Sequence, residues 1–211
     1  MDRPLGVAVI GAGRIGTLRA RLCAKHPCVG FLAIADTDNE KARSLAETTS
    51  AATYSTDNDA IISLPEVNTV FVSTPEGEHV AAVCKALELG KAVMVEKPLA
   101  LTLSDAEQIL SALAVSKGSL RVGYSRRFKE CFLRAKEQMN HQRLGRIVGG
   151  LARVYNSRAQ AFAILKRDPH ATPVLDVLTY YVDLMCWFMD GNAPVEVVAR
   201  GVQHDARQGI V

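Results

Sequence analysis

The chain has 211 residues, of which 48% are hydrophobic and 22% charged, and its formal net charge is +3. This composition is typical of a globular protein with room for one or two domains and a substantial core. It excludes a membrane span, because no run of about 18 apolar residues occurs. The five cysteines show no C-x-x-C spacing and the five histidines no ligand spacing, so neither a disulfide framework nor a metal site is expected.

The N-terminus, MDRPLG, shows no apolar core or cleavage site of a signal peptide, so a cytoplasmic location is expected.

The charged residues are unevenly spread along the chain. Residues 121–170 contain 12 Lys and Arg against three Asp and Glu. Such a segment attracts an anionic substrate or nucleic acid, or it forms a solvated face or an oligomer contact. No nucleic-acid-binding motif accompanies it, so a nucleic-acid partner is not expected.

The most informative stretch is VAVIGAGRIG, at residues 7–16. Its first four residues are all apolar, as in a buried parallel strand. The next six spell G-x-G-x-x-G and lead into a helical pattern. In this setting Gly11 permits a tight turn, Gly13 lets a pyrophosphate approach the backbone, and Gly16 lets the helix pack closely on the strand. The stretch predicts a dinucleotide-binding turn.

An acidic residue follows at the expected distance. The apolar run 31–35 ends in Asp36, 20 residues beyond Gly16. A carboxylate there accepts hydrogen bonds from the adenosine ribose hydroxyls and repels a 2′-phosphate, which favours NAD over NADP. The alternative is a plain strand–helix–strand turn in which Asp36 caps the helix that begins near Asp38.

Strands and helices alternate with short loops through the first 123 residues. The capping box Ser104-Asp105-Ala106-Glu107 opens the last helix of this series. The pattern predicts a doubly wound parallel sheet. The expected strands are 7–10, 31–35, 52–54, 69–74, 92–95 and 120–123. The expected helices after the first are 39–47, 57–62, 79–89 and 104–117.

The pattern changes near Tyr124, which predicts a first domain at 1–123 and a second at 124–211. In the second domain, helices are expected at 128–141 and 173–190, strands at 146–156 and 195–202, and a loop at 157–172. Two strands make a poor sheet by themselves. Either the polypeptide is longer than this sequence, or a partner completes the layer.

Glu96-Lys97-Pro98 directly follows the fifth strand. In a doubly wound sheet, ligands bind beyond the carboxyl ends of the strands, so this tripeptide faces the binding crevice. Here the chain resembles the Gfo/Idh/MocA family of sugar and polyol oxidoreductases. The resemblance rests on GAGRIG, STPEGEH (73–79), GKAVMVEKPLA (90–100), GYSRRF (123–128) and LDVLTYYVDL (175–184).

The resemblance implies an N-terminal Rossmann domain and a C-terminal α/β (α+β) domain with an open, mostly antiparallel sheet. That sheet often forms the oligomer interface in the family, so a homo-oligomer is expected. Family members are longer, which agrees with an incomplete second domain. The implied activity is hydride transfer between NAD and a secondary alcohol or ketone of a sugar, polyol or related compound.

Lys97 is similar to the active-site lysine of the family. Its ammonium can hydrogen-bond the reacting oxygen and stabilise negative charge on it. The alternative is a surface lysine at a strand end. Pro98 fixes the loop, and a cis Lys97–Pro98 bond is one way to do so. Glu96 either pairs with Lys97 or binds the nicotinamide ribose, and the sequence does not choose.

A second catalytic element is expected on the helix 173–190. Asp176, Tyr180 and Asp183 fall at i, i+4 and i+7 and share one face. Many family members carry Asp followed four residues later by His as an acid/base pair, and Tyr180 stands at that histidine position. One interpretation is lost catalysis, which predicts an NAD-binding regulator. The other is a tyrosine acid/base, as in branches similar to glucose–fructose oxidoreductase.

The tyrosine interpretation is chemically sound, because an ammonium such as that of Lys97 favours the ionised form of a nearby phenol. Tyr180 then takes the hydroxyl proton as hydride leaves the substrate carbon. Asp176 orients a substrate hydroxyl or Lys97. The alternative for Tyr180 is a half-buried packing residue.

The resemblance implies further cofactor contacts in the fingerprint, after the fourth strand and after the sixth strand: Arg14, Ile15, Ser73, Thr74, Pro75, His79 and Arg127. His79 reaches the edge of the active site or serves as a neutral cap or packing residue. Arg126 or Arg127 contacts the nicotinamide or the substrate, or is an exposed charge at the domain hinge.

Overall fold

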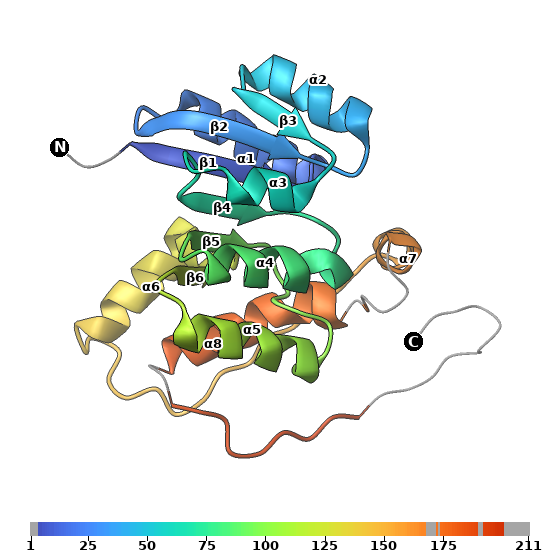
Figure 1. Ribbon diagram of the computed structural model, residues 1–211. Coiled ribbons are helices and arrows are strands. Elements are labelled where there is room, and N and C mark those ends of the chain that lie inside the picture. The colour runs from blue at the N-terminus through green and yellow to red at the C-terminus, as the bar shows by residue number, and fades with distance from the viewer. Residues whose placement is uncertain (1–3, 168–171, 173, 190–191, 201–211) are drawn as a thin grey trace. The chain divides into compact units, whose positions relative to one another are not determined.

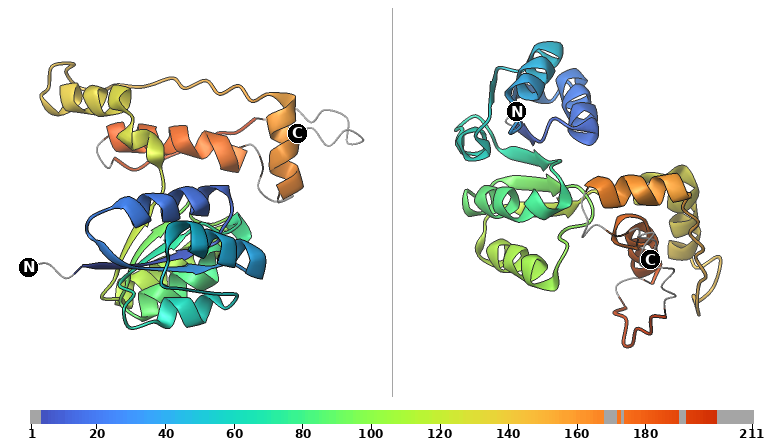
Figure 2. Two further views of the ribbon diagram at one scale, coloured as in Figure 1. Left: turned by 90° about the horizontal axis from the view of Figure 1, so that it is seen from above. Right: turned by 90° about the vertical axis from the view of Figure 1, so that its right-hand side faces the viewer.

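The computed structural model describes residues 4–167, 172, 174–189 and 192–200. The chain divides into two compact units, residues 1–123 and 124–211. Figures 1 and 2 show the elements of each unit.

The first unit is built on a six-stranded sheet with the strand order β3-β2-β1-β4-β5-β6, and every neighbouring pair is parallel. The strands are β1 (Leu5–Ile10), β2 (Val29–Ala35), β3 (Thr53–Ser55), β4 (Thr69–Val72), β5 (Ala92–Val95) and β6 (Ser119–Val122). The helices are α1 (Arg14–Lys25), α2 (Asn39–Thr49), α3 (Asn58–Ser63), α4 (His79–Glu88) and α5 (Leu103–Val115), and a 3₁₀ turn, η1 (Glu76–Glu78), precedes α4. The predicted doubly wound parallel sheet is confirmed.

Strand β1 shows why both faces of this sheet are covered. Its residues are all apolar, and alternate side chains point to opposite faces. Val7 and Val9 belong to a buried cluster with residues of α1 and α2, whereas Ala8 and Ile10 belong to a cluster with residues of α3, α4 and α5. All four are at most 1% exposed. The strand is therefore the centre of two hydrophobic layers.

Helix boundaries in the first unit follow from local side chains. Asp38 and Asp57 cap α2 and α3 by accepting backbone N–H bonds. The predicted capping box at Ser104 is wrong. The N-cap of α5 is Thr102, whose hydroxyl oxygen accepts from the Asp105 N–H at 3.1 Å and whose O–H donates to the Asp105 carboxylate at 2.7 Å. The cap thus lies two residues earlier than predicted, and the helix begins at Leu103.

The second unit contains a 3₁₀ turn and helices in its described residues: η2 (Ser125–Phe128), α6 (Glu130–Asn140), α7 (Arg158–Arg167), a π-helical turn η3 (Val174–Leu178) and α8 (Thr179–Phe188). The strand predicted at 146–156 is wrong, and residues 195–200 also form no strand; 201 and 202 lie outside the described residues. A strand needs a neighbour to pair its backbone groups, and the described part of this unit supplies none. Val148 and Val195 are accordingly almost fully exposed. The predicted antiparallel sheet is not seen in the described residues.

The prediction of a loop at 157–172 is also wrong, because α7 occupies most of it. The segment RAQAFAILKR lacks a strong apolar period but is rich in residues with high helix propensity. Ser157 precedes it and accepts the Gln160 N–H at 3.2 Å with its hydroxyl oxygen. Helix propensity and a cap favour this helix, and the burial of Ile164 at 3% exposure adds tertiary packing.

The helix predicted at 173–190 is present in a modified form. Its first turn, η3, is π-helical, and α8 continues it to Phe188. Pro173, Asp190 and Gly191 lie outside the described residues. The Thr172 carbonyl accepts the Asp176 N–H at 2.9 Å, and its side-chain oxygen accepts the Leu175 N–H at 3.3 Å. Single π turns of this kind are frequent at functional sites.

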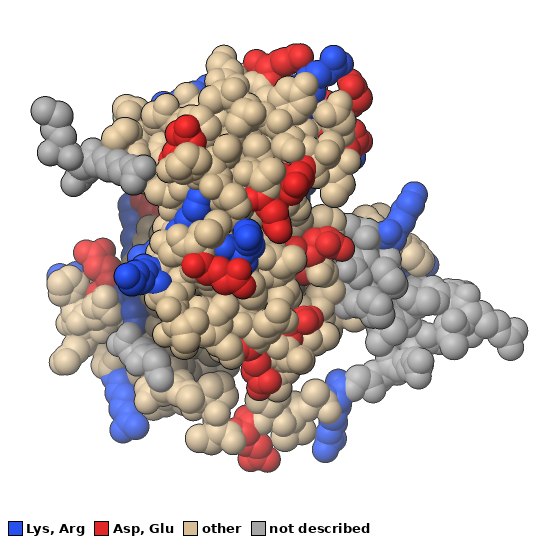
Figure 3. Space-filling model, viewed as in Figure 1, with Lys and Arg blue, Asp and Glu red and all other residues tan. Residues whose placement is uncertain are grey.

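Acidic and basic side chains are interspersed on the face shown in Figure 3, so neither sign of charge dominates there.

Among the helices that the structure describes, none combines the length and apolar character needed to cross a membrane.

Candidate functional site

The sheet register places four predicted site residues in one row with Gly123. Gly11, Asp36, Ser73, Glu96 and Gly123 each follow the last residue of a strand, and those last residues are paired in register across β2, β1, β4, β5 and β6. All five donate their backbone N–H to the last carbonyl of a neighbouring strand, at 2.7 to 3.3 Å. The carboxyl edge of the sheet therefore brings the fingerprint, the acidic residue and the Glu-Lys-Pro motif together, as expected for a ligand-binding edge.

The three fingerprint glycines have different surroundings. Gly11 has φ +95°, a conformation that L side chains rarely adopt. A Cβ at Gly16 would lie 1.7 Å from the Gly11 carbonyl oxygen, so only glycine allows this approach of α1 to the turn. A Cβ at Gly13 would meet nothing within 4 Å. Gly13 is also the N-cap of α1 and gives no side-chain cap, which leaves the helix N-terminus open to an anion.

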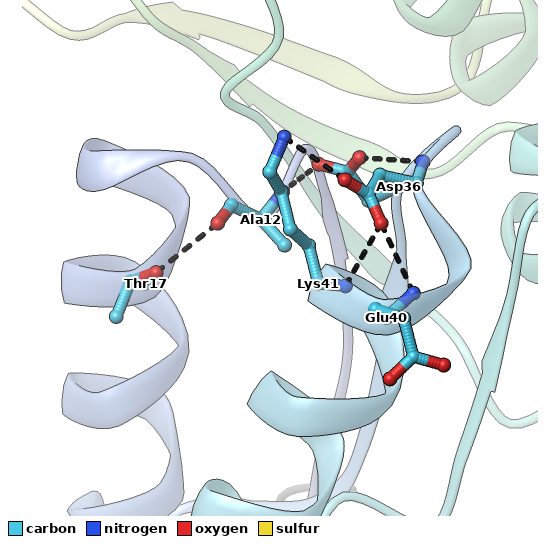
Figure 4. Close-up of polar contacts among 6 residues, drawn as sticks. Ala12, Thr17, Asp36, Glu40 and Lys41 are labelled. Atoms are coloured by element: carbon cyan, nitrogen blue, oxygen red, sulfur yellow. Dashed lines mark hydrogen bonds and ion pairs between the residues drawn. The ribbon is translucent and has the colours of Figure 1, made fainter.

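Asp36 is held against the fingerprint loop (Figure 4). Its carboxylate accepts the Ala12 N–H at 2.6 Å and the Asp38 N–H at 2.9 Å. It does not cap the following helix; Asp38 does so by accepting the N–H groups of Glu40 and Lys41 at 3.1 and 3.3 Å. The interpretation of Asp36 as a helix cap is therefore wrong. The carboxylates of Asp36 and Asp38 thus both lie shortly after the end of β2.

Asp38 is itself stabilised as a carboxylate. The backbone N–H of Lys41 and then its ammonium, 3.2 Å from Asp38 Oδ2, lower the pKa of this carboxyl below its ordinary value. The charge of Lys41 is thus paired with Asp38. This arrangement keeps Asp38 ionised, and the Lys41 ammonium balances its charge.

The loop after β4 carries two buried hydroxyl groups. Ser73 Oγ and Thr74 Oγ1 have no hydrogen-bond partner among the residues that the structure describes. The Ser73 Cβ lies 3.4 Å from the position of a Cβ at Gly16, so this loop borders the fingerprint turn. Pro75 begins the turn that leads to α4. Unpaired buried hydroxyls are costly and are characteristic of places where a ligand supplies the missing partner.

His79, the first residue of α4, is 0% exposed. Its Nδ1 lies 3.0 Å from the carbonyl oxygen of Pro98, and its Nε2 lies 3.2 Å from that of Thr74. The ring thus links the loop after β4 to the loop after β5. Both nitrogens are engaged with backbone oxygens, which is the arrangement of a packing residue rather than of a side chain at an open edge.

Glu96 and Lys97 follow β5. Glu96 Oε1 accepts two hydrogen bonds from Arg19 of α1, from Nε at 2.9 Å and from Nη2 at 2.6 Å. The sequence left two roles open for Glu96, pairing with Lys97 and binding the ribose. The bidentate contact with Arg19 is a third role, which neither of these includes. Lys97 is partly exposed, and the Lys97–Pro98 peptide bond is cis.

The second unit holds the other predicted catalytic residues. Asp176 lies in the π-helical turn and Tyr180 in the first turn of α8, and both are partly exposed. The Tyr180 ring contacts the Tyr124 ring edge-on, with a centroid distance of 6.2 Å. The Arg126 guanidinium lies over the rings of both Tyr180 and Tyr181, at 5.0 and 4.7 Å from their centroids. Aromatic and cation–π contacts therefore orient the Tyr180 ring.

Arg127 makes a bidentate ion pair with Asp183 of α8, with nitrogen–oxygen distances of 2.8 and 2.5 Å. The Asp183 side chain is 9% exposed, and the pairing raises the pKa of Arg127 further above its ordinary value. Tyr124 adds a hydrogen bond of 2.9 Å between its hydroxyl and that of Thr179, and burial raises its pKa. The segment around η2 thus fixes α8. Contact of Arg127 with a cofactor stays a prediction.

Sequence reasoning missed Arg19, the Arg127–Asp183 pair and the contact of Arg126 with Tyr180. Arg19 and Glu96 are 77 residues apart, and Arg127 and Asp183 are 56 apart. No short spacing signals such pairs. A nearly buried carboxylate such as Asp183 requires a cation. This rule implies that Asp183 has a basic partner, but it does not identify Arg127 as that partner.

A parallel sheet with a G-x-G-x-x-G turn after its first strand and an acidic residue after its second defines a dinucleotide-binding Rossmann domain. Residues 5–124 match the model of the GFO_IDH_MocA family, described as "Oxidoreductase family, NAD-binding Rossmann fold". The chain belongs to this oxidoreductase family, and its first unit is the NAD-binding domain.

Similar proteins include inositol dehydrogenases. The chain is 30% identical over 211 residues to an inositol 2-dehydrogenase of Acidothermus cellulolyticus, with 99% of this chain and 60% of the relative covered. It is 28% identical over 204 residues to an inositol 2-dehydrogenase of Rhizobium meliloti, with 90% and 56% covered. The chain spans little more than half the length of these relatives.

A solved structure gives the same result for the fold. The myo-inositol dehydrogenase of Lactobacillus casei, crystallised with NAD(H) and myo-inositol, has a TM-score of 0.73 and 27% sequence identity. The match covers 89% of this chain and 55% of that one.

Proposed function

We propose that this protein is an NAD-dependent dehydrogenase that oxidises a secondary alcohol of a cyclic polyol of the inositol class. The observation that carries the proposal is the register of the sheet edge, in which Glu96 lies in one row with Gly11 and Ser73. Lys97 therefore follows the same edge that carries the fingerprint. The inositol dehydrogenases among the relatives support the substrate class.

The residues of the first unit fit a bound dinucleotide. The open space beside Gly13 and the uncapped start of α1 suit a pyrophosphate. The unpaired hydroxyls of Ser73 and Thr74 offer hydrogen bonds to a ligand at the strand end. Asp36 and Asp38 favour the ribose hydroxyls of NAD over the 2′-phosphate of NADP.

Bound NAD supplies the nicotinamide ring that accepts a hydride from the substrate carbon. Lys97 donates a hydrogen bond to the reacting oxygen and stabilises the negative charge that develops on it. Tyr180 accepts the proton of the hydroxyl group as the carbonyl forms, and Asp176 orients a substrate hydroxyl or Lys97. Pro75 and Arg127 complete the set of cofactor contacts that we expect. We also expect a homo-oligomer formed through the second domain.

A second candidate is an NAD-binding regulator without catalysis. It is favoured by a tyrosine at position 180, where many family members have histidine. The two candidates make the same prediction for nucleotide binding and opposite predictions for turnover.

The test is NADH formation by the purified protein with NAD⁺ and each of myo-, scyllo- and D-chiro-inositol, together with calorimetric titration of NAD⁺ and NADP⁺. We expect tighter binding of NAD⁺ and turnover of at least one inositol. Lys97→Met should lower kcat at least about a hundredfold, because it removes a donor to the developing oxyanion. Lys117→Met, an exposed lysine of the same unit, is the matched control.

The outcomes separate the candidates. NAD⁺ binding without reduction across a wider panel of polyols supports the regulator. Turnover that survives Lys97→Met rules out the proposed role of this lysine. Tyr180→Phe tests the acid/base role in the same assay, and wild-type kcat in that variant would exclude it.

A further inference from the structure

The two neighbours of Lys97 in the chain are both anchored to helices of the first unit. Before it, Glu96 accepts two hydrogen bonds from Arg19, which lies on α1 three residues after Gly16. The Arg19 and Glu96 side chains are 20% and 15% exposed, so the pair is shielded from most of the solvent. Bidentate arginine–carboxylate pairs fix both position and direction.

After it, Pro98 is buried, and its carbonyl oxygen lies 3.0 Å from Nδ1 of His79. The other ring nitrogen lies 3.2 Å from the carbonyl oxygen of Thr74. A neutral imidazole donates from only one nitrogen, so one contact is a hydrogen bond in either tautomer and both are hydrogen bonds in the imidazolium. In each case the ring is enclosed between the two loops that follow β4 and β5.

We propose that Arg19 and His79 are positioning residues that together hold Lys97 at the sheet edge, one acting through Glu96 and the other through the Pro98 backbone. The proposal rests on the catalytic role of Lys97 given above. It also connects the fingerprint helix to the catalytic lysine, because Arg19 extends from the helix that begins at the dinucleotide-binding turn.

Two simpler roles are weaker. His79 as a cofactor ligand conflicts with its complete burial and with the engagement of both ring nitrogens. Arg19 as a phosphate ligand would leave Glu96, a mostly buried carboxylate, without the cation that pairs with it. A phosphate-binding arginine would also affect NAD⁺ affinity rather than the rate of the chemical step.

The test is a double-mutant cycle between positions 19 and 97, measured as kcat, KM for NAD⁺ and thermal stability. We expect Arg19→Met to lower kcat about tenfold, since small displacements of a catalytic group cost one to two orders of magnitude in rate. The KM for NAD⁺ should change less than about twofold, because no ligand contact is lost. In the Lys97→Met background the same change should lower kcat less than about twofold.

Conservative and control variants sharpen the result. Arg19→Lys keeps the charge but loses the bidentate geometry, so it should recover part of the rate. Arg21→Met removes an exposed arginine from the same helix and should leave kcat unchanged. His79→Gln keeps one donor and should lower kcat in the same Lys97-dependent way. If His79→Gln does not fold, the Arg19 cycle decides the proposal.

Equal losses in both backgrounds, or a raised KM with unchanged kcat, would overturn the proposal. A second readout does not depend on turnover: the rate of Lys97 acetylation by acetic anhydride, followed by mass spectrometry relative to Lys117. Arg19→Met should change that relative rate, and an unchanged rate counts against the proposal. If Lys97→Met retains activity, the proposed catalytic role of Lys97 fails, and the labelling rate still reports whether Arg19 positions Lys97.

Discussion

The two units hold their candidate site residues by different means. In the first unit, Gly11, Ser73 and Glu96 are placed by backbone hydrogen bonds that extend the register of a parallel sheet. In the second, α8 is fixed by side chains: Arg127 pairs with Asp183, and Tyr124 bonds Thr179. A residue that is held by backbone hydrogen bonds keeps its position when its side chain is changed. A helix that is held by side-chain contacts does not keep its position when those side chains are changed.

This difference separates residues that bind the ligand or take part in catalysis from residues that hold other residues in place. At the sheet edge, most substitutions should alter binding or catalysis and leave the fold intact, except where the backbone itself is too close for a Cβ. In the second unit, substitutions that break the side-chain contacts of α8 should alter the orientation of Tyr180, which lies on this helix. The following predictions test this contrast, in order of expected effect.

The largest effect is expected where backbone approaches backbone. Gly16→Ala should destabilise the protein by about 3 kcal/mol or more, because its Cβ would lie 1.7 Å from the Gly11 carbonyl oxygen. Gly13→Ala should cost at most about 1 kcal/mol, since the space beside it is open and alanine is only a poorer N-cap. Urea unfolding measures both.

Calorimetric titration of NAD⁺ completes this comparison. Gly13→Ala should weaken binding while the fold persists, because its methyl group enters the space proposed for the pyrophosphate. Wild-type stability of Gly16→Ala would contradict the close approach of α1 to the turn. Wild-type NAD⁺ affinity of Gly13→Ala would contradict the proposed position of the phosphates.

The next effect concerns the ion pair on α8. Arg127→Met should cost about 1–3 kcal/mol, because the Asp183 carboxylate, 9% exposed, loses its cation. Arg134→Met removes an exposed pair with Glu130 and should cost less than about 0.5 kcal/mol. Fluorescence of Trp187, the single tryptophan, follows unfolding of this unit. Equal losses in the two variants would show that the Arg127 pair does not fix α8.

A smaller effect is expected at Tyr124. Tyr124→Phe keeps the ring contact with Tyr180 but removes the hydrogen bond to Thr179, and should cost about 1 kcal/mol in urea unfolding. Tyr155→Phe is the control, because Tyr155 is 84% exposed. If both variants unfold like the wild type, the hydroxyl contact contributes nothing to the position of α8.

The smallest effect is pH-dependent and lies at the sheet edge. Hydrogen bonds from Lys41 lower the pKa of Asp38 below 3.8, so its contribution is present above that value and is lost as the pH falls through the lowered pKa. Asp38→Asn should keep a helix cap and reduce the loss of stability in acid. Acid unfolding curves with unchanged slopes would show that the charge of Asp38 is not coupled to folding.

Prediction of the fold from sequence succeeded where the pattern was local and failed where it depended on a neighbour. The apolar run of β1, the spacing to Asp36 and the alternation of strands with helices were sufficient for the first unit. The segment 146–156 has a strand-like sequence, yet it forms no strand, because pairing depends on a partner that its own residues do not encode. Helix α7 shows the converse, since propensity formed a helix without a clear apolar period.

For the candidate site, the residue types were predictable and their contacts were not. The fingerprint and the Glu-Lys-Pro motif identified positions at one edge of the sheet. Asp36 was assigned to the ribose side, and the structure adds that it also holds the Ala12 N–H. Arg19 gave no signal, because its role depends on a carboxylate 77 residues away.

The sequence by itself determined the order of the elements, the glycine turn and the edge at which Lys97 emerges, because apolar periodicity and backbone conformation are local properties. Only the tertiary structure decided that Arg19 anchors Glu96, that His79 joins two loops and that Arg127 fixes α8 through Asp183. These contacts join residues distant in the chain, and long-range pairing depends on the folded backbone rather than on any spacing that can be read along it.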